Sequence, residues 1–64
     1  MKIILPDKSV REYSQGTIAA GDLVRELGFD PIEVLVARNG TLVVEDALLE
    51  NDDEVRIIRI AHGG

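Results

Sequence analysis

The stretch that decides the fold is EVLVARNGTLVV, residues 33–44. Its centre, Asn39-Gly40, separates two runs rich in β-branched residues. Asn-Gly in this setting is the strongest short-range signal for a two-residue hairpin turn, because both residues tolerate a left-handed backbone. Residues 33–38 and 41–44 are therefore predicted to form two antiparallel strands.

A helix is predicted before this hairpin, over residues 18–27. Thr17 is the predicted N-terminal cap, and Gly28 is the predicted left-handed residue at which the helix stops. Gly21 costs the helix about 1 kcal/mol relative to alanine, so the helix must gain stability by packing against a sheet. The residues that recur at helical spacing and form the apolar face are Ala20, Leu23, Val24 and Leu27.

Strands are also predicted near both ends of the chain. Residues 1–5 form an apolar run, and residues 9–13 alternate between polar and apolar, with a tight turn between the two segments. Residues 55–60 form the last predicted strand. Period-two alternation and turn residues at the boundaries are typical of strands.

The segment between the hairpin and the last strand is predicted to be a short connector followed by an acidic turn. Leu48 or Leu49 is expected to anchor the connector, residues 45–49, to the core. The acidic run in residues 50–54 is predicted to be a solvated loop without a metal ion, because a calcium loop of the EF-hand type needs a central glycine and more regular ligand spacing.

This order of elements predicts an α+β domain of two layers, with one helix across one face of a single sheet. Residues 1–60 are predicted to be one domain, and residues 61–64 a flexible C-terminal tail.

Alternation along the strands predicts which side chains face the helix. Val55 and Ile57 must point inward, because the opposite register would bury Arg56. The same test places Met1, Ile3, Leu5, Val34 and Val36 in the core. The apolar residues left on the face away from the helix, where we expect them to be exposed to water, are Ile4, Leu35, Ala37, Ile58 and Ile60.

Composition excludes several classes of function. The chain has 64 residues, a formal net charge of −5, no cysteine and one histidine. This excludes a separate cofactor domain, a disulfide framework, a zinc finger and a thiol redox site. The basic residues are scattered and the chain has one Tyr and one Phe, so direct nucleic-acid binding is not expected. We expect a cytoplasmic protein, because we find no basic and apolar leader and no apolar run near the about 18 residues that cross a membrane.

The chain resembles the ubiquitin-like sulfur carriers, of which the thiamine and molybdopterin carriers are best known, and most of all the thiamine type and the carriers for tRNA 2-thiouridine. The resemblance rests on the order of elements and on three motifs: Arg38-Asn39-Gly40, the acidic turn of residues 51–54 before Val55-Arg56-Ile57, and the terminal Gly63-Gly64. It implies a β-grasp fold with a five-stranded mixed sheet. The last strand would then lie between the first and third, and the outward apolar residues would form one partner-binding patch.

The resemblance also implies a carrier that is not itself an enzyme. An E1-like adenylyltransferase would use ATP to adenylate the Gly64 carboxylate, so the carrier itself binds no cofactor. A sulfurtransferase or cysteine desulfurase would supply sulfur, and the resulting thiocarboxylate would serve an acceptor synthase or a tRNA-thiolating enzyme. Without Cβ atoms, Gly63 and Gly64 would let the terminus pass through a narrow channel. His62 is expected to be solvated and not a general base, and the free carrier is expected to be a monomer.

Three alternatives stay open at this point. The chain could be a ubiquitin-like modifier that joins Gly64 to lysines of target proteins. Lys2 and Lys8 are its only lysines, so long chains of copies are not expected. It could instead be the small subunit of a molybdopterin synthase. A plain binding module is the third alternative, and it would tolerate deletion of Gly63 and Gly64.

Overall fold

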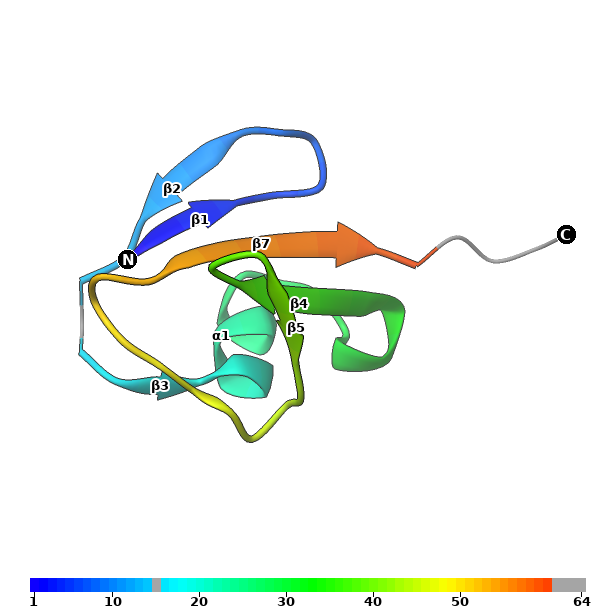
Figure 1. The fold of residues 1–64 in the computed structure, drawn as a ribbon. Helices are drawn as coiled ribbons and strands as arrows, with labels where there is room; N and C mark the ends of the chain where they lie inside the picture. The colour runs from blue at the N-terminus through cyan, green and yellow to red at the C-terminus, as the bar shows by residue number, and fades with distance from the viewer. Residues whose placement is uncertain (15, 61–64) are drawn as a thin grey trace, which may run out of the picture.

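The structure is a computed structural model that describes residues 1–14 and 16–60 (Figure 1). The described elements, in chain order, are β1 (Lys2–Ile4), β2 (Val10–Glu12), β3 (Ile18–Ala19), α1 (Ala20–Glu26), the 3-10 turn η1 (Pro31–Glu33), β4 (Val34–Arg38), β5 (Thr41–Val43), β6 (Leu48–Leu49) and β7 (Glu54–Arg59). The predicted elements are present, and their ends shift by at most two residues.

The main sheet has five strands in the order β2-β1-β7-β4-β5. Strand β7 is parallel to β1 and antiparallel to β4, which confirms the central position that the resemblance implied (Figure 1). Helix α1 packs against one face of this mixed sheet. The fold is therefore α+β, of the ubiquitin-like β-grasp type.

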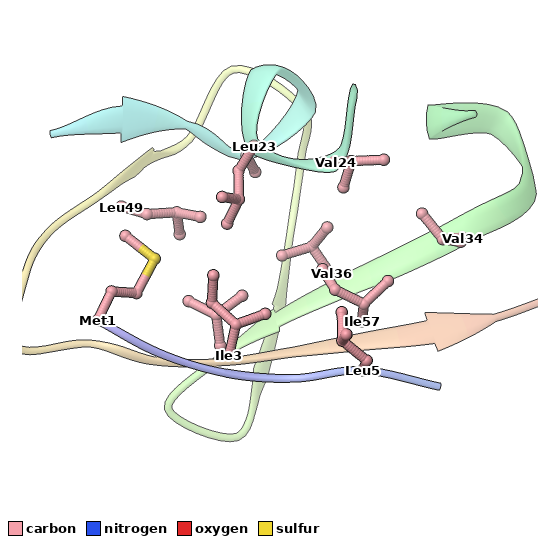
Figure 2. Close-up of a cluster of buried hydrophobic side chains, with 11 residues drawn as sticks. Met1, Ile3, Leu5, Leu23, Val24, Val34, Val36, Leu49 and Ile57 are labelled. Carbon is pink, nitrogen blue, oxygen red and sulfur yellow. The ribbon is translucent and has the colours of Figure 1, made fainter. Parts of the chain in front are cut away.

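The hydrophobic core lies between the sheet and α1. Figure 2 shows Ile3, Val36 and Ile57 pointing from the sheet toward Leu23 and Val24 of the helix. All seven residues predicted to point inward from the strands are buried: Met1, Ile3, Leu5, Val34, Val36, Val55 and Ile57. Each large apolar side chain buried in this way contributes about 1.5–3 kcal/mol relative to exposure, so the core depends on this register of the strands.

Helix α1 begins two residues later than predicted. Ile18 and Ala19 pair instead as β3 with β6 in a separate two-stranded sheet. The prediction that Thr17 caps the helix is wrong, because Ala19 holds the cap position and makes no side-chain cap hydrogen bond. Backbone carbonyls of the loop between β5 and β6 accept hydrogen bonds from the first two N–H groups of the helix, at 2.9 and 2.8 Å.

The two glycines near the ends of α1 are required for different structural reasons. A Cβ on Gly21 would lie 3.2 Å from the Cβ and 3.0 Å from the Oε1 of Glu45, so glycine permits the close approach of the capping loop. Gly28 has φ +92° and ends the helix as predicted. The N–H groups of Gly28 and Phe29 donate to the carbonyls of Arg25 and Val24, each at 3.0 Å, which is a Schellman motif.

The connector between β5 and β7 is anchored by Leu49. This residue is fully buried as part of β6, whereas Leu48 is exposed. In Figure 2, Leu49 lies beside Met1 at one side of the core. Of the two predicted anchors, Leu49 is therefore the residue that holds the connector to the core.

The hairpin between β4 and β5 has the predicted turn. Asn39 and Gly40 have φ of +51° and +87°, as a type I′ turn requires. Asn39 also ties the hairpin to the start of β7. Its Nδ2 donates to Asp53 at 3.1 Å, and its Oδ1 accepts from the N–H of Glu54 at 2.9 Å. The N–H of Glu50 donates to the Asp53 carboxylate and, with Asn39, holds the pKa of Asp53 below its ordinary value.

Two substitutions of Asn39 should separate its backbone role from its side-chain role. We expect Asn39→Gly to lose about 1 kcal/mol of stability, because it keeps the left-handed backbone and removes two hydrogen bonds. Asn39→Ala loses the same bonds and also strains the turn, so we expect a further loss of about 1 kcal/mol. Urea unfolding of both variants measures the difference. Equal stability of the two variants would contradict a contribution from the left-handed conformation.

Candidate functional site

The face of the sheet opposite α1 brings most of the predicted outward residues together. The register places Leu35 of β4 directly opposite Ile58 of β7. Ile4 of β1 and Ala37 of β4 lie on either side of Arg56 in β7. The predicted patch residues therefore come from three neighbouring strands, with a cation between them.

Exposure differs among these residues. Leu35 is 42% exposed and Ile58 is 38% exposed, whereas Ile4 and Ile60 are half-buried. The prediction that Ala37 is exposed to water is wrong, because only 8% of it is accessible. Its methyl group is flanked by the longer Arg56 and Leu42 on the adjacent strands. Ala37 therefore lines a hollow in this face instead of projecting from it.

Two exposed apolar residues on this face were missed by the sequence analysis. Leu42 lies opposite Ala37, and Val10 lies opposite Ile4, so both share the outward face. They are 59% and 53% exposed. A signal for Leu42 was available, because a two-residue turn at Asn39-Gly40 fixes its pairing with Ala37. We define the sheet patch as Ile4, Val10, Leu35, Leu42, Ile58 and Ile60, together with Ala37 in its hollow.

The end of β7 is held in place from two sides. The N–H of Ile60 donates to the carbonyl of Glu33 in η1 at 2.9 Å. The guanidinium of Arg59 lies over the ring of Phe29, 5.5 Å from its centroid. Such a cation–π contact contributes about 0.5–1 kcal/mol at an exposed site. The last described residue of the chain thus leaves the sheet from a fixed position.

The predicted tail, with His62, Gly63 and Gly64, lies outside the described residues. Its point of departure is described, and this is Ile60, the residue that follows the end of the central strand. Four residues that are extended at about 3.3 Å each span about 13 Å.

The charged side chains of the described residues are not buried and form no metal-binding group. Across residues 1–14 and 16–60, no three His, Cys, Asp or Glu side chains are grouped so that they could hold a metal ion. In the same part of the chain, no polar or charged residue is buried. The acidic turn keeps its carboxylates at the surface, where Asp53 serves the hairpin network.

Within the part of the chain that the structure describes, no helix has the length and apolar character needed to cross a membrane.

Comparison with known proteins identifies the family. The model of a family described as small archaeal modifier protein 2 matches residues 9–61. The chain belongs to this family. A search of curated proteins finds no match. The small archaeal modifier protein 2 family is a ubiquitin-like β-grasp family related to the thiamine and molybdopterin sulfur carriers, and its members are of the modifier or carrier type and are not enzymes themselves. The matched region includes β2 to β7 and ends two residues before Gly63.

Proposed function

We propose that the protein is a sulfur carrier whose C-terminal Gly64 carboxylate is activated by an E1-like enzyme. The observation that carries this proposal is the position of the central strand β7, because Ile60, the residue after its end, is held by a hydrogen bond only four residues before Gly64. Membership of the small archaeal modifier protein 2 family supports it, because proteins of this type work with E1-like activating enzymes. A lack of cysteine also fits, since the carried sulfur must then reside on a carboxylate.

The chemistry takes place at the Gly64 carboxylate, in the site of the partner enzyme. A carboxylate oxygen attacks the α-phosphorus of ATP, which releases pyrophosphate and leaves an acyl adenylate. The terminal sulfur of a persulfide on a sulfurtransferase or cysteine desulfurase attacks the Gly64 carbonyl carbon, and AMP leaves. A thiol then attacks the cysteine sulfur of the resulting acyl disulfide, which frees the thiocarboxylate and leaves a disulfide on the sulfur donor.

In this proposal the chain contributes a docking surface as well as the carboxylate. Burial of an exposed apolar side chain against a partner contributes about 1.5–3 kcal/mol when the burial is complete. Three residues of the sheet patch are exposed enough to be buried by a partner in this way, namely Leu35, Leu42 and Ile58. Binding of the patch would then place Ile60, and with it the start of the tail, at the surface of the activating enzyme.

We propose that the thiocarboxylate delivers sulfur to a synthase that forms the thiazole of thiamine, or to an enzyme that 2-thiolates tRNA. Both acceptors belong to the carrier types that the chain resembles most. The small subunit of a molybdopterin synthase would use the same thiocarboxylate and is the alternative acceptor role.

A second candidate function is protein modification, and the family description favours it. The first step is the same, but a lysine amine attacks the Gly64 adenylate, AMP leaves and an isopeptide bond forms. Lys2 and Lys8 are the only positions at which a second copy could be attached, so conjugates should carry few copies each.

Intact-mass spectrometry tests both functions in parallel reactions. With ATP, an E1-like enzyme and a persulfide donor, we expect one oxygen to be replaced by sulfur, and fragmentation should locate the change at Gly64. With ATP and a lysine-bearing target but no sulfur donor, covalent adducts of higher mass would support the modifier function. An unchanged mass in the first reaction with several E1-like enzymes would contradict the sulfur-carrier proposal.

A further inference from the structure

A hollow of about 580 Å³ lies in the sheet patch, between β4, β5 and β7. These three strands pair side by side in the order β7-β4-β5 (Figure 1). Ala37 forms part of its floor, and Leu42 and Ile58 supply apolar walls. The remaining residues of its lining are Asn39, Gly40, Glu54 and Arg56.

The hollow exists because small residues stand among large ones. Ala37 lies directly between Arg56 and Leu42 across the sheet, and Gly40 has no side chain at the turn. A side chain as long as leucine at position 37 would fill the space between these neighbours. The low exposure of Ala37, at 8%, agrees with a floor that lies below the surrounding side chains.

Arg56 determines the chemistry at the edge of this hollow. Its neighbours across the sheet are Ile4 and Ala37, and Glu54, two residues earlier on the same strand, is the other charged residue of the lining. Both ion pairs among the described residues involve Arg25, so Arg56 forms none within that part of the chain. A partner that covers the sheet patch would therefore bury an uncompensated guanidinium unless it supplied an acceptor.

We propose that the hollow is a socket that receives one large apolar side chain of the activating enzyme, next to a carboxylate of that enzyme that pairs with Arg56. The inference rests on the proposed function, since it names the enzyme of that function as the partner. An apolar anchor in a pocket, with a charged pair beside it, is the usual arrangement of an interface hot spot. The protein carries net negative charge overall and Glu54 lines the same hollow, but the unpaired guanidinium of Arg56 favours a negative charge on the partner at this point.

A pair of substitutions at the floor tests the socket. Ala37→Leu fills the hollow, whereas Ala37→Ser leaves it open. In ATP-dependent pyrophosphate exchange by an E1-like enzyme that activates the wild-type chain, we expect Ala37→Leu to raise KM about 10-fold or more, since a lost hot spot costs that much affinity. The kcat should not change, because the tail is unaltered. The serine variant should stay within about 3-fold of the wild-type KM, which is below the loss of a hot spot.

A second pair of variants keeps the test valid if Ala37→Leu fails to fold. Leu42 and Leu48 are the same residue type and are 59% and 60% exposed, but only Leu42 lines the hollow. We expect Leu42→Ala to raise KM and Leu48→Ala to leave it unchanged. A third pair of variants tests the charge. Arg56→Gln should raise KM. Arg11→Gln removes an equal charge from the opposite side of the sheet and is the matched control.

The possible results test the socket, the acidic group of the partner and the proposed function separately. Equal KM values for Ala37→Leu and Ala37→Ser, or for Leu42→Ala and Leu48→Ala, would overturn the socket while the activation reaction stays intact. An unchanged KM for Arg56→Gln would overturn the acidic partner. If the wild-type chain supports no exchange with E1-like enzymes, the proposed function itself fails, and the socket loses its partner with it.

Discussion

Replacement of Ile57 by Asp is expected to unfold the domain. Ile57 is only 1% exposed and packs in the core between the sheet and α1 (Figure 2). In the part of the chain that the structure describes, no polar group is buried near it that could pair with a carboxylate. An unpaired carboxylate at this position costs several kcal/mol, which is comparable with the about 5 kcal/mol total stability of a domain of this size.

Replacement of the next residue, Ile58, should have the opposite effect. Ile58 is 38% exposed and faces away from the helix, so an Asp there reaches water and the fold is retained. The variant should nevertheless bind the activating enzyme less well, because the wall of the hollow becomes charged. Circular dichroism with urea unfolding, together with the KM of pyrophosphate exchange, measures both effects.

Two milder substitutions serve as matched controls. Ile57→Val should cost about 0.5–1.5 kcal/mol, because it removes one buried methylene group and leaves a small cavity. Ile58→Val removes the same group from a half-exposed position and should change stability less. If Ile58→Asp unfolds the protein and Ile57→Asp only impairs binding, the register of β7 is wrong by one residue.

Much of this fold was predictable because a single charged residue fixed the register. Burial of Arg56 was not acceptable, so Val55 and Ile57 had to face the helix, and the structure confirms this. Alternation along a strand gives no information on which strands are neighbours. The central position of β7 came from the resemblance to the sulfur carriers.

The predictions that failed concern features that depend on distant parts of the chain. Thr17 looked like a cap, but backbone carbonyls from the loop before β6 take that role. The β3–β6 pairing has only two residues on each side, too few to show any periodicity. Ala37 was placed on the correct face, but its exposure depends on the lengths of Arg56 and Leu42, which alternation within one strand does not describe.

Deletion of Gly64 is expected to abolish thiocarboxylate formation while the fold is retained. The described core and the hydrogen bond that fixes the end of β7 are made by residues up to Ile60. Removal of one residue withdraws the terminal carboxylate by about 3.5 Å, which is enough to prevent attack on the α-phosphorus of ATP. Gly63→Val should have a similar effect, because a branched side chain would block passage through a narrow channel.

The truncated chain also offers a test that separates docking from chemistry. Because deletion of Gly64 leaves the sheet patch intact, the truncated protein should compete with the wild-type chain for the activating enzyme and inhibit its pyrophosphate exchange. The same truncation combined with Ile58→Asp should inhibit far less, since this substitution places a charge in the sheet patch and weakens docking. His62→Ala in the full chain should keep its activity, because the proposed reaction at Gly64 assigns no proton transfer to this histidine. Full activity of the truncated chain would mean that the Gly64 carboxylate is not the reacting group, and the carrier and modifier functions would then fail together.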